Sequence, residues 1–169
     1  FDSYTGSGRN FYLYNDPSHS RFSLIPWDLN LSFGAYANNW NVTTADPVTL
    51  SNLEQRPLNR RILENDSLRR TYLLYIKELL DGPAQADSIA RVSAAWQVMI
   101  DSLVQADTNK LHSYEEFTKN ITDNVSVIDN MARVTIPGLV SFANKRGTAL
   151  RGMLPENLSA SVKYEKQHM

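Results

Sequence analysis

The hydrophobic pattern of the first 55 residues predicts extended structure and loops. Residues 10–15 (NFYLYN) and 21–27 (RFSLIPW) are short aromatic and aliphatic runs, a composition typical of β-strands. The turn signal Asp16-Pro17-Ser18 lies between them, so the two runs are predicted to form a β-hairpin with a loop of about five residues. Residues 1–9, with glycines and small polar side chains, predict a loop, and residues 28–55 predict an irregular segment with a short helix.

From Arg56 onward, apolar residues recur at the spacing of α-helices. Pro57 suits the first position of a helix that ends at Asn65-Asp66, where Asp66 is expected to cap the next helix. Gly82-Pro83 is expected to close that second helix, and a third is expected over residues 87–105. The apolar positions of these three helices are Leu58, Ile62 and Leu63, then Leu68, Tyr72, Leu73, Ile76, Leu79 and Leu80, then Ile89, Val92, Trp96, Met99, Ile100 and Leu103.

Two further helices are predicted before the end of the chain. Residues 113–116 read as a capping box that starts a fourth helix. Its expected apolar stripe consists of Phe117, Ile121, Val125, Ile128 and Met131. Thr135 and Pro137 are expected to start a fifth helix ending near Leu154-Pro155. We therefore predict one α+β domain, mostly helical, over residues 1–155, in which a helical block of residues 56–154 follows the hairpin and residues 156–169 form a polar tail.

Composition excludes several classes of function. The chain has 169 residues and a formal net charge of -1, so no bulk electrostatic case exists for binding nucleic acid or an anionic membrane. No apolar run reaches the roughly 18 to 20 residues of a membrane span. Cysteine is absent, which excludes disulfides and thiolate metal sites. His19, His112 and His168 are far apart in the sequence, so no histidine metal site is expected.

The residues best suited to chemistry frame the predicted hairpin. Asn10 opens the first strand and Asp28 follows the second, so a hairpin should make them neighbours. A loop folding back from Asn10 would bring Asp2 beside them. The order loop Asp, Asn, strand–turn–strand, Asp is that of the protein-kinase catalytic core, and Mg²⁺ prefers such oxygen ligands. Taken alone, this spacing is weak evidence. It also fits Asp2 as an ordinary loop residue, Asn10 as a turn or strand-edge residue and Asp28 as a helix cap or turn residue.

The amino-acid sequence of this segment is more specific evidence than the spacing of Asp2, Asn10 and Asp28. Residues 9–34 (RNFYLYNDPSHSRFSLIPWDLNLSFG) resemble the core motif of the CotH kinase family, proteins first known from spore coats and similar in fold to protein and small-molecule kinases. The matching motifs are Arg9-Asn10-Phe11-Tyr12-Leu13-Tyr14, Ile25-Pro26-Trp27-Asp28-Leu29-Asn30 and Phe33-Gly34. The resemblance continues through Arg56-Pro57-Leu58, Tyr72, Asp107, Phe117 and Pro137-Gly138-Leu139 to Arg146.

The resemblance implies a protein-kinase-like C-terminal lobe and a role for each site residue. Asp28 and Asn10 would bind Mg²⁺ on the phosphates of ATP, and Asp2 would be the catalytic Asp. Asn30 stands where the family often has Asp, and its amide keeps a metal-binding oxygen but drops the charge. Trp27 is interpreted as a packing residue.

The resemblance also implies parts that this segment lacks. A kinase needs a lysine that pairs with the phosphates and a loop that covers them, yet no lysine precedes Lys77. We expect the N-terminal lobe that covers the nucleotide to lie upstream of Phe1 in the full-length protein or to come from another chain. These residues alone are therefore expected to be inactive or nearly so.

Two functions from different classes remain open, together with a helical structural domain whose motif arises by chance. The first is an atypical protein kinase that transfers the ATP γ-phosphoryl group to a Ser or Thr hydroxyl of a secreted or surface protein. The second is a pseudokinase or adhesion module at a cell surface or spore coat. The resemblance alone implies the extracellular or coat location. Six Asn-x-Ser/Thr sequons begin at Asn30, Asn41, Asn65, Asn120, Asn124 and Asn157; we interpret them as an Asn-rich surface, because a glycan on Asn30 would block the candidate site.

Overall fold

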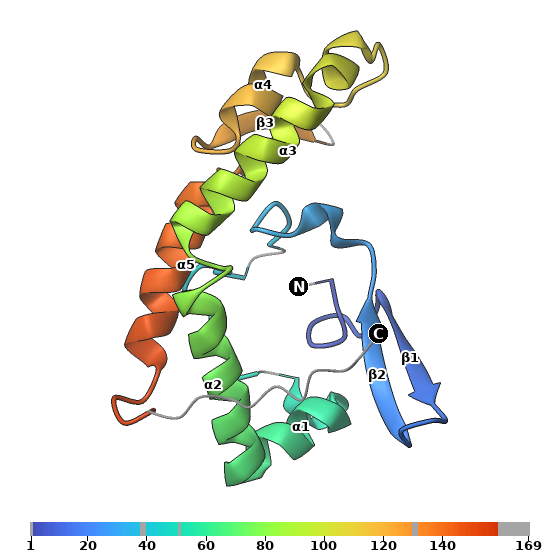
Figure 1. The fold of residues 1–169 in the computed structure, drawn as a ribbon, viewed down its shortest axis with the longest axis vertical. Helices are drawn as coiled ribbons and strands as arrows, with labels where there is room; N and C mark the ends of the chain where they lie inside the picture. The colour runs from blue at the N-terminus through green and yellow to red at the C-terminus, as the bar shows by residue number, and fades with distance from the viewer. Residues whose placement is uncertain (1, 38–39, 51, 130–131, 159–169) are drawn as a thin grey trace.

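The computed structural model describes residues 2–37, 40–50, 52–129 and 132–158 of the chain. Two antiparallel hairpins and five α-helices make an α+β fold that is mostly helical (Figure 1). The order is β1 (Phe11–Asp16), β2 (Arg21–Pro26), the 3₁₀ turns η1 (Leu29–Leu31) and η2 (Leu53–Gln55), α1 (Pro57–Glu64), α2 (Asp66–Asp81), α3 (Ala86–Ala106), α4 (Tyr114–Lys119), β3 (Val125–Asp129), β4 (Ala132–Ile136) and α5 (Leu139–Met153).

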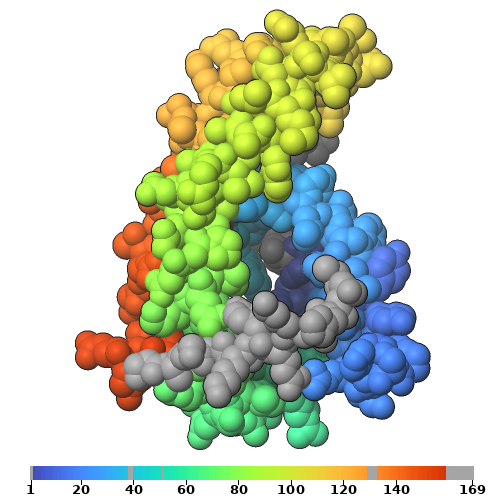
Figure 2. All heavy atoms as spheres, in the orientation of Figure 1, coloured from blue at the N-terminus to red at the C-terminus, as the bar shows by residue number. Residues whose placement is uncertain are grey.

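The predicted N-terminal hairpin is confirmed. Its register runs from Phe11 opposite Pro26 to Asp16 opposite Arg21. The hairpin stands away from the helices, with a hollow of the surface between them (Figure 2). Large apolar side chains on both faces are consequently exposed, for example Tyr12 at 64% and Phe22 at 67%.

Helices α1 and α2 begin and end close to their predicted limits. Pro57 occupies the first turn of α1, where its missing N–H leaves no hydrogen bond unmade. The expectation that Asp66 caps α2 is wrong by one residue. Asn65 is the N-cap, and its side-chain oxygen accepts a hydrogen bond from the N–H of Leu68 at 3.0 Å.

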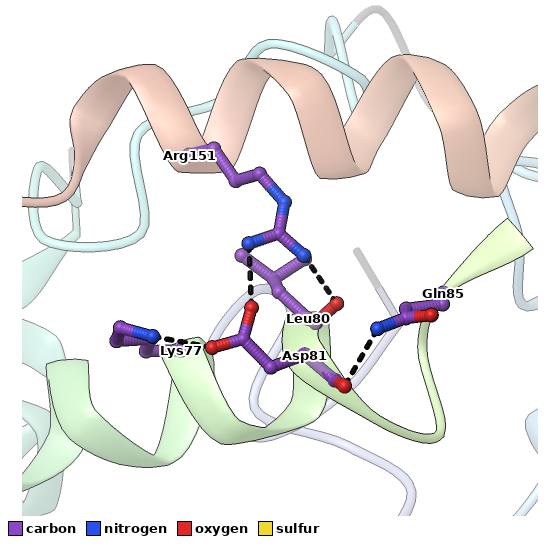
Figure 3. A network of polar contacts seen from close by, with 5 residues as sticks. All are labelled: Lys77, Leu80, Asp81, Gln85 and Arg151. Atoms are coloured by element: carbon purple, nitrogen blue, oxygen red, sulfur yellow. Dashed lines mark hydrogen bonds and ion pairs between the residues drawn. The ribbon is translucent and has the colours of Figure 1, made fainter.

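Helices α2, α3 and α5 form a column along one side of the molecule (Figure 1). The end of α2 is held to α5 by Arg151, whose guanidinium donates to the Leu80 carbonyl and to the Asp81 carboxylate, the latter at 2.7 Å (Figure 3). Lys77 pairs with the same carboxylate from within α2. The Arg151 guanidinium, at the last turn of α2, also complements the partial negative charge of the carbonyls there.

The predicted fourth helix is far shorter than its apolar pattern indicated. The capping box at Ser113 and Glu116 is confirmed, but α4 ends at Lys119 and the chain then forms the β3–β4 hairpin. Val125 and Val127 are buried and alternate with exposed residues, so the pattern after residue 124 has the period of a strand. Met131, the last member of the expected stripe, lies outside the described residues. The helical block of residues 56–154 therefore contains a hairpin.

The expected start of the fifth helix is also wrong. Thr135 lies in β4, paired with Ser126, and α5 begins at Leu139 after Gly138. A Cβ atom on Gly138 would lie 2.5 Å from the Thr122 carbonyl oxygen, so only glycine permits this close approach. The helix ends at Met153, near the predicted limit. Most of the expected polar tail lies outside the described residues.

The irregular segment after β2 returns to the helices through the Phe33-Gly34 pair. The Phe33 ring packs edge-on against Phe142 of α5, with ring centroids 6.0 Å apart. Further along, the Arg146 guanidinium of α5 donates to the carbonyls of Thr43 and Ala45. These contacts attach the segment after Asp28 to α5 at Phe33 and again at Thr43 and Ala45.

Candidate functional site

Asp2 and Asn10 lie against each other at the open end of the β1–β2 hairpin. The Asn10 amide nitrogen donates to the Asp2 carboxylate oxygen Oδ2 at 3.0 Å and to the Asp2 carbonyl at 3.2 Å. The loop of residues 2–9 thus folds back onto the start of β1, as the sequence predicted. Because the amide nitrogen is committed to two acceptors, Oδ1 of Asn10 is the atom able to ligate a cation.

Asp28 joins the same end of the hairpin from the other strand. The N–H of Trp27, the residue before Asp28, donates to the Asn10 carbonyl at 3.1 Å. Trp27 also stacks on Tyr12 with ring centroids 6.1 Å apart, which supports the packing role predicted for it. Asp28 itself is exposed and precedes η1. That its carboxylate shares one cation with Asn10, with the two oxygens within about 4 Å of each other, stays a prediction.

Both candidate cation ligands adopt an unusual backbone conformation. Asn10 has φ 56° and Asp28 has φ 58°, in the left-handed region that few residues with side chains enter. Asn and Asp are the side chains that tolerate it best, because a short polar group can bond locally. This conformation turns the chain sharply where it enters the hairpin at Asn10 and where it leaves it at Asp28, both at the open end.

Asn30 lies within η1 and does not join Asp2 and Asn10 through any hydrogen bond seen in the described residues. It is exposed and lines the edge of a wide groove of about 900 Å³ between the segment after Asp28 and helix α3. The groove is mostly apolar, and its wall includes Phe33, Ile89, Val92, Trp96, Ile100, Val104, Phe117, Ile121 and Leu139. A metal role for Asn30 stays a prediction.

Sequence reasoning missed the residues that fix the Asp2 loop. The Ser7 hydroxyl donates to Oδ1 of Asp2 at 2.6 Å. From the far side of the loop, Asn52, Arg56 and Asn59 all donate to residues 5 and 6. Ser7 lies in the same predicted loop as Asp2, so the local sequence offers it as a partner. No local signal in the sequence connects residues 52–59 with residues 5 and 6.

The other charged groups do not enlarge the site. Asp16 is at the far end of the hairpin, where hydrogen bonds from Ser18 and His19 lower its pKa to about 2. Within the described residues, no three His, Asp or Glu side chains gather closely enough to hold a metal ion. A site with one carboxylate and one amide is of another kind, since phosphate and water oxygens complete the coordination of Mg²⁺ in such sites.

Comparison with known proteins identifies the family of the chain. The family model of the CotH kinase protein matches residues 1–150. The chain belongs to the CotH kinase family. No curated protein and no solved structure matches the chain. Membership in the CotH kinase family suggests a kinase-related function and, with it, ATP and Mg²⁺ as ligands. None of the helices in the described part of the chain combines the length and the apolar character that a membrane crossing requires.

Proposed function

We propose that this chain is the C-terminal lobe of an atypical protein kinase, which transfers the γ-phosphoryl group of ATP to a Ser or Thr hydroxyl of a secreted or surface protein. The observation that carries the proposal is the direct hydrogen bond between Asp2 and Asn10. It joins the expected catalytic Asp to an expected metal ligand, in a chain of the CotH kinase family. Asp28 reaches the same end of the hairpin through the Trp27–Asn10 backbone bond.

The residues present fit Mg²⁺ in kind. The Asp28 carboxylate and the Asn10 amide oxygen are hard oxygen ligands, and one or two protein ligands suffice where phosphate and water supply the others. Asn30 would add a further oxygen without charge. A magnesium ion held there would compensate the negative charge of the β- and γ-phosphate oxygens.

Asp2 is assigned to orient the acceptor hydroxyl and to take its proton. The hydrogen bonds from Ser7 and Asn10 each use one lone pair of Oδ1 and Oδ2. A carboxylate has about four acceptor positions, so an incoming hydroxyl can still donate to Asp2. The two existing bonds hold the carboxylate in one orientation, which is what positions a reacting group.

The lysine that pairs with phosphate in kinases has to come from outside this lobe. Lys77, the first lysine of the chain, is bound to Asp81 within α2. We therefore assign the nucleotide-covering lobe to another part of the full-length protein or to a second chain.

The metal assignment is tested by Asp28→Asn in the full-length protein. The isosteric amide tolerates the left-handed backbone but removes the charge, so Mg²⁺-dependent ATP binding and phosphoryl transfer should both fall by at least about 100-fold. Asp16→Asn, the same change at the other end of the hairpin, is the matched control and should leave both unchanged. Titration calorimetry with ATP and Mg²⁺ and radiolabel transfer to a Ser/Thr-rich acceptor measure them. Transfer at the parent rate by Asp28→Asn would refute the mechanism.

Asp2→Ala should separate the two functions. A carboxylate that orients a hydroxyl does not hold ATP, so turnover should fall while Mg²⁺-dependent ATP binding stays within about twofold of the parent. Loss of ATP binding in this variant would show that Asp2 is not the catalytic Asp. If the parent itself binds no ATP, the pseudokinase or adhesion module replaces the kinase as the better proposal.

A further inference from the structure

The loop that carries Asp2 is held from a distant part of the chain. The Asn52 amide nitrogen donates to two successive carbonyls of the loop, that of Thr5 at 2.9 Å and that of Gly6 at 2.7 Å. The Arg56 guanidinium also donates to the Gly6 carbonyl. Three donated bonds therefore converge on two peptide groups that are separated from their donors by about fifty residues.

Helix α1 adds two further contacts to the same turn. The Asn59 amide donates to the Thr5 hydroxyl at 3.0 Å. The free backbone N–H of Leu58, in the first turn of α1, donates to the Tyr4 hydroxyl at 3.0 Å. Asn52 and Arg56 flank η2, so these two residues and the start of α1 hold residues 4–6 together.

The loop itself is shaped to accept this grip. Gly6 is buried, and Gly8 has φ 74°. A Cβ atom on Gly8 would lie 3.1 Å from the Arg56 guanidinium, so glycine lets the loop approach it. Within the loop, the N–H groups of Gly8 and Arg9 donate to the Ser3 carbonyl at 2.9 and 3.4 Å. The gripped residues thus lie between Asp2 and Ser7, the two ends of the hydrogen bond that orients the carboxylate.

We propose that Asn52 and Arg56 are positioning residues for Asp2, and that they act by fixing the turn of residues 4–6 from outside the hairpin. This inference rests on the proposed function, in which Asp2 orients the acceptor hydroxyl. The cation ligands have contacts that do not depend on the Asp2 carboxylate, because the Trp27 N–H donates to the Asn10 carbonyl and the Asn10 amide also donates to the Asp2 backbone carbonyl. We call the hydrogen bonds from Asn52 and Arg56 to this turn the clamp. Weakening the clamp should therefore disturb the Asp2 carboxylate and leave nucleotide binding unchanged. A displacement of about 1 Å at a reacting group costs on the order of 100-fold in rate.

The test uses Asn52→Asp in the full-length protein. The change keeps the size of the side chain, removes the two N–H donors and faces the carbonyls of Thr5 and Gly6 with a carboxylate. We expect kcat to fall by about 10- to 100-fold, with the KM for ATP within about twofold of the parent. Hydrogen-exchange mass spectrometry should show faster exchange in the peptide covering residues 3–10, while peptides of α3 and α5 are unchanged.

Asn65→Asp is the matched control. Asn65 caps α2 and makes its bond to Leu68, and Asp serves as well as Asn at an N-cap, so kcat and loop exchange should stay at the parent values. Arg56→Lys is the second variant, in case Asn52→Asp does not fold. It keeps the charge but loses the planar fork of donors, and it should reproduce the fall in kcat and the faster loop exchange.

The possible outcomes distinguish a failure of the clamp from a failure of the proposed kinase function. If both clamp variants keep the parent kcat and loop exchange, or if Asn65→Asp lowers kcat as much as Asn52→Asp, the clamp is refuted. If the KM for ATP rises with an unchanged kcat, Asn52 and Arg56 do not act through Asp2. If the parent transfers no phosphate, the proposed function fails, and the exchange comparison alone decides whether the clamp exists.

Discussion

At residue scale, positive backbone φ angles mark several single residues in and beside the N-terminal hairpin as locally constrained. Asn10, Ser20, Asp28 and Phe33 have φ between 49° and 58°. Such conformations cost free energy and persist only where surrounding contacts over-determine them. Asn10 is held by Asp2 and by the N–H of Trp27. Two of these four residues, Asn10 and Asp28, are ones that the proposal assigns to the cation.

Gly34 carries a second constraint at residue scale. Its φ is 80°, and a Cβ atom there would lie 2.9 Å from a ring carbon of Phe142. Gly34→Ala should thus lower the free energy of unfolding by more than about 1 kcal/mol. Gly152→Ala is the control, because nothing lies within 4 Å of a Cβ there and the residue is in α5. It should raise stability by up to about 0.5–1 kcal/mol. Urea denaturation measures both, and midpoints that move in the same direction would contradict this account.

At the scale of elements, signals contained within a few residues predict the structure better than features that depend on distant partners. The capping box at Ser113 lies wholly within four residues, so the sequence shows it. The end of α4 depends on residues far along the chain, because the Asn120 amide donates to the carbonyls of Ile136 and Pro137. The apolar positions of residues 117–131 fit a helix in part, and only the alternation at Val125 and Val127 indicates a strand. Short apolar runs of this kind are ambiguous without their partners.

Asn120 is expected to hold the end of α4 to both ends of the β3–β4 hairpin. Its amide nitrogen lies 3.1 Å from the Asp123 carbonyl, 3.4 Å from that of Ile136 and 3.2 Å from that of Pro137. Asn120→Ala should leave these carbonyls without their donor and cost about 1–3 kcal/mol. It should also speed hydrogen exchange in β3 and β4. Asn109→Ala, at an exposed loop position after α3, is the control and should change neither. Equal effects of the two substitutions would show that Asn120 does not hold the β3–β4 hairpin in place.

At the scale of the whole molecule, the candidate site divides into a part that the sequence shows and a part that it hides. Asp2, Asn10 and Asp28 lie within 27 residues of one another, and the predicted loop that folds back from Asn10 brings Asp2 to it. The contacts of Asn52 with the loop span 46 and 47 residues. Asn and Arg in an irregular segment carry no periodic signal, so only the folded chain identifies the clamp.

The joint between α2 and α5 gives a prediction about the molecule as a whole and about pH. Hydrogen bonds from Lys77 and then from Arg151 lower the pKa of Asp81 below its usual 3.8. A carboxylate whose pKa is lowered in the folded state adds stability above its unfolded pKa, and that stability is lost as the pH falls through the folded pKa. The carboxylate side chain is 43% exposed, so its contribution should be modest.

Asp81→Asn should accordingly lower Tm by up to about 2–4 °C at pH 7, for a loss of roughly 1 kcal/mol or less. Below about pH 4 the difference from the parent should shrink, because the parent carboxylate becomes protonated as well. Glu115→Gln is the control: it breaks a pair with Lys119 inside α4, joins no two helices and should move Tm less at pH 7. Thermal unfolding of the three proteins between pH 3 and pH 7 measures this. A difference between Asp81→Asn and the parent that is as large at pH 3 as at pH 7 would show that the Asp81 charge does not hold α2 to α5.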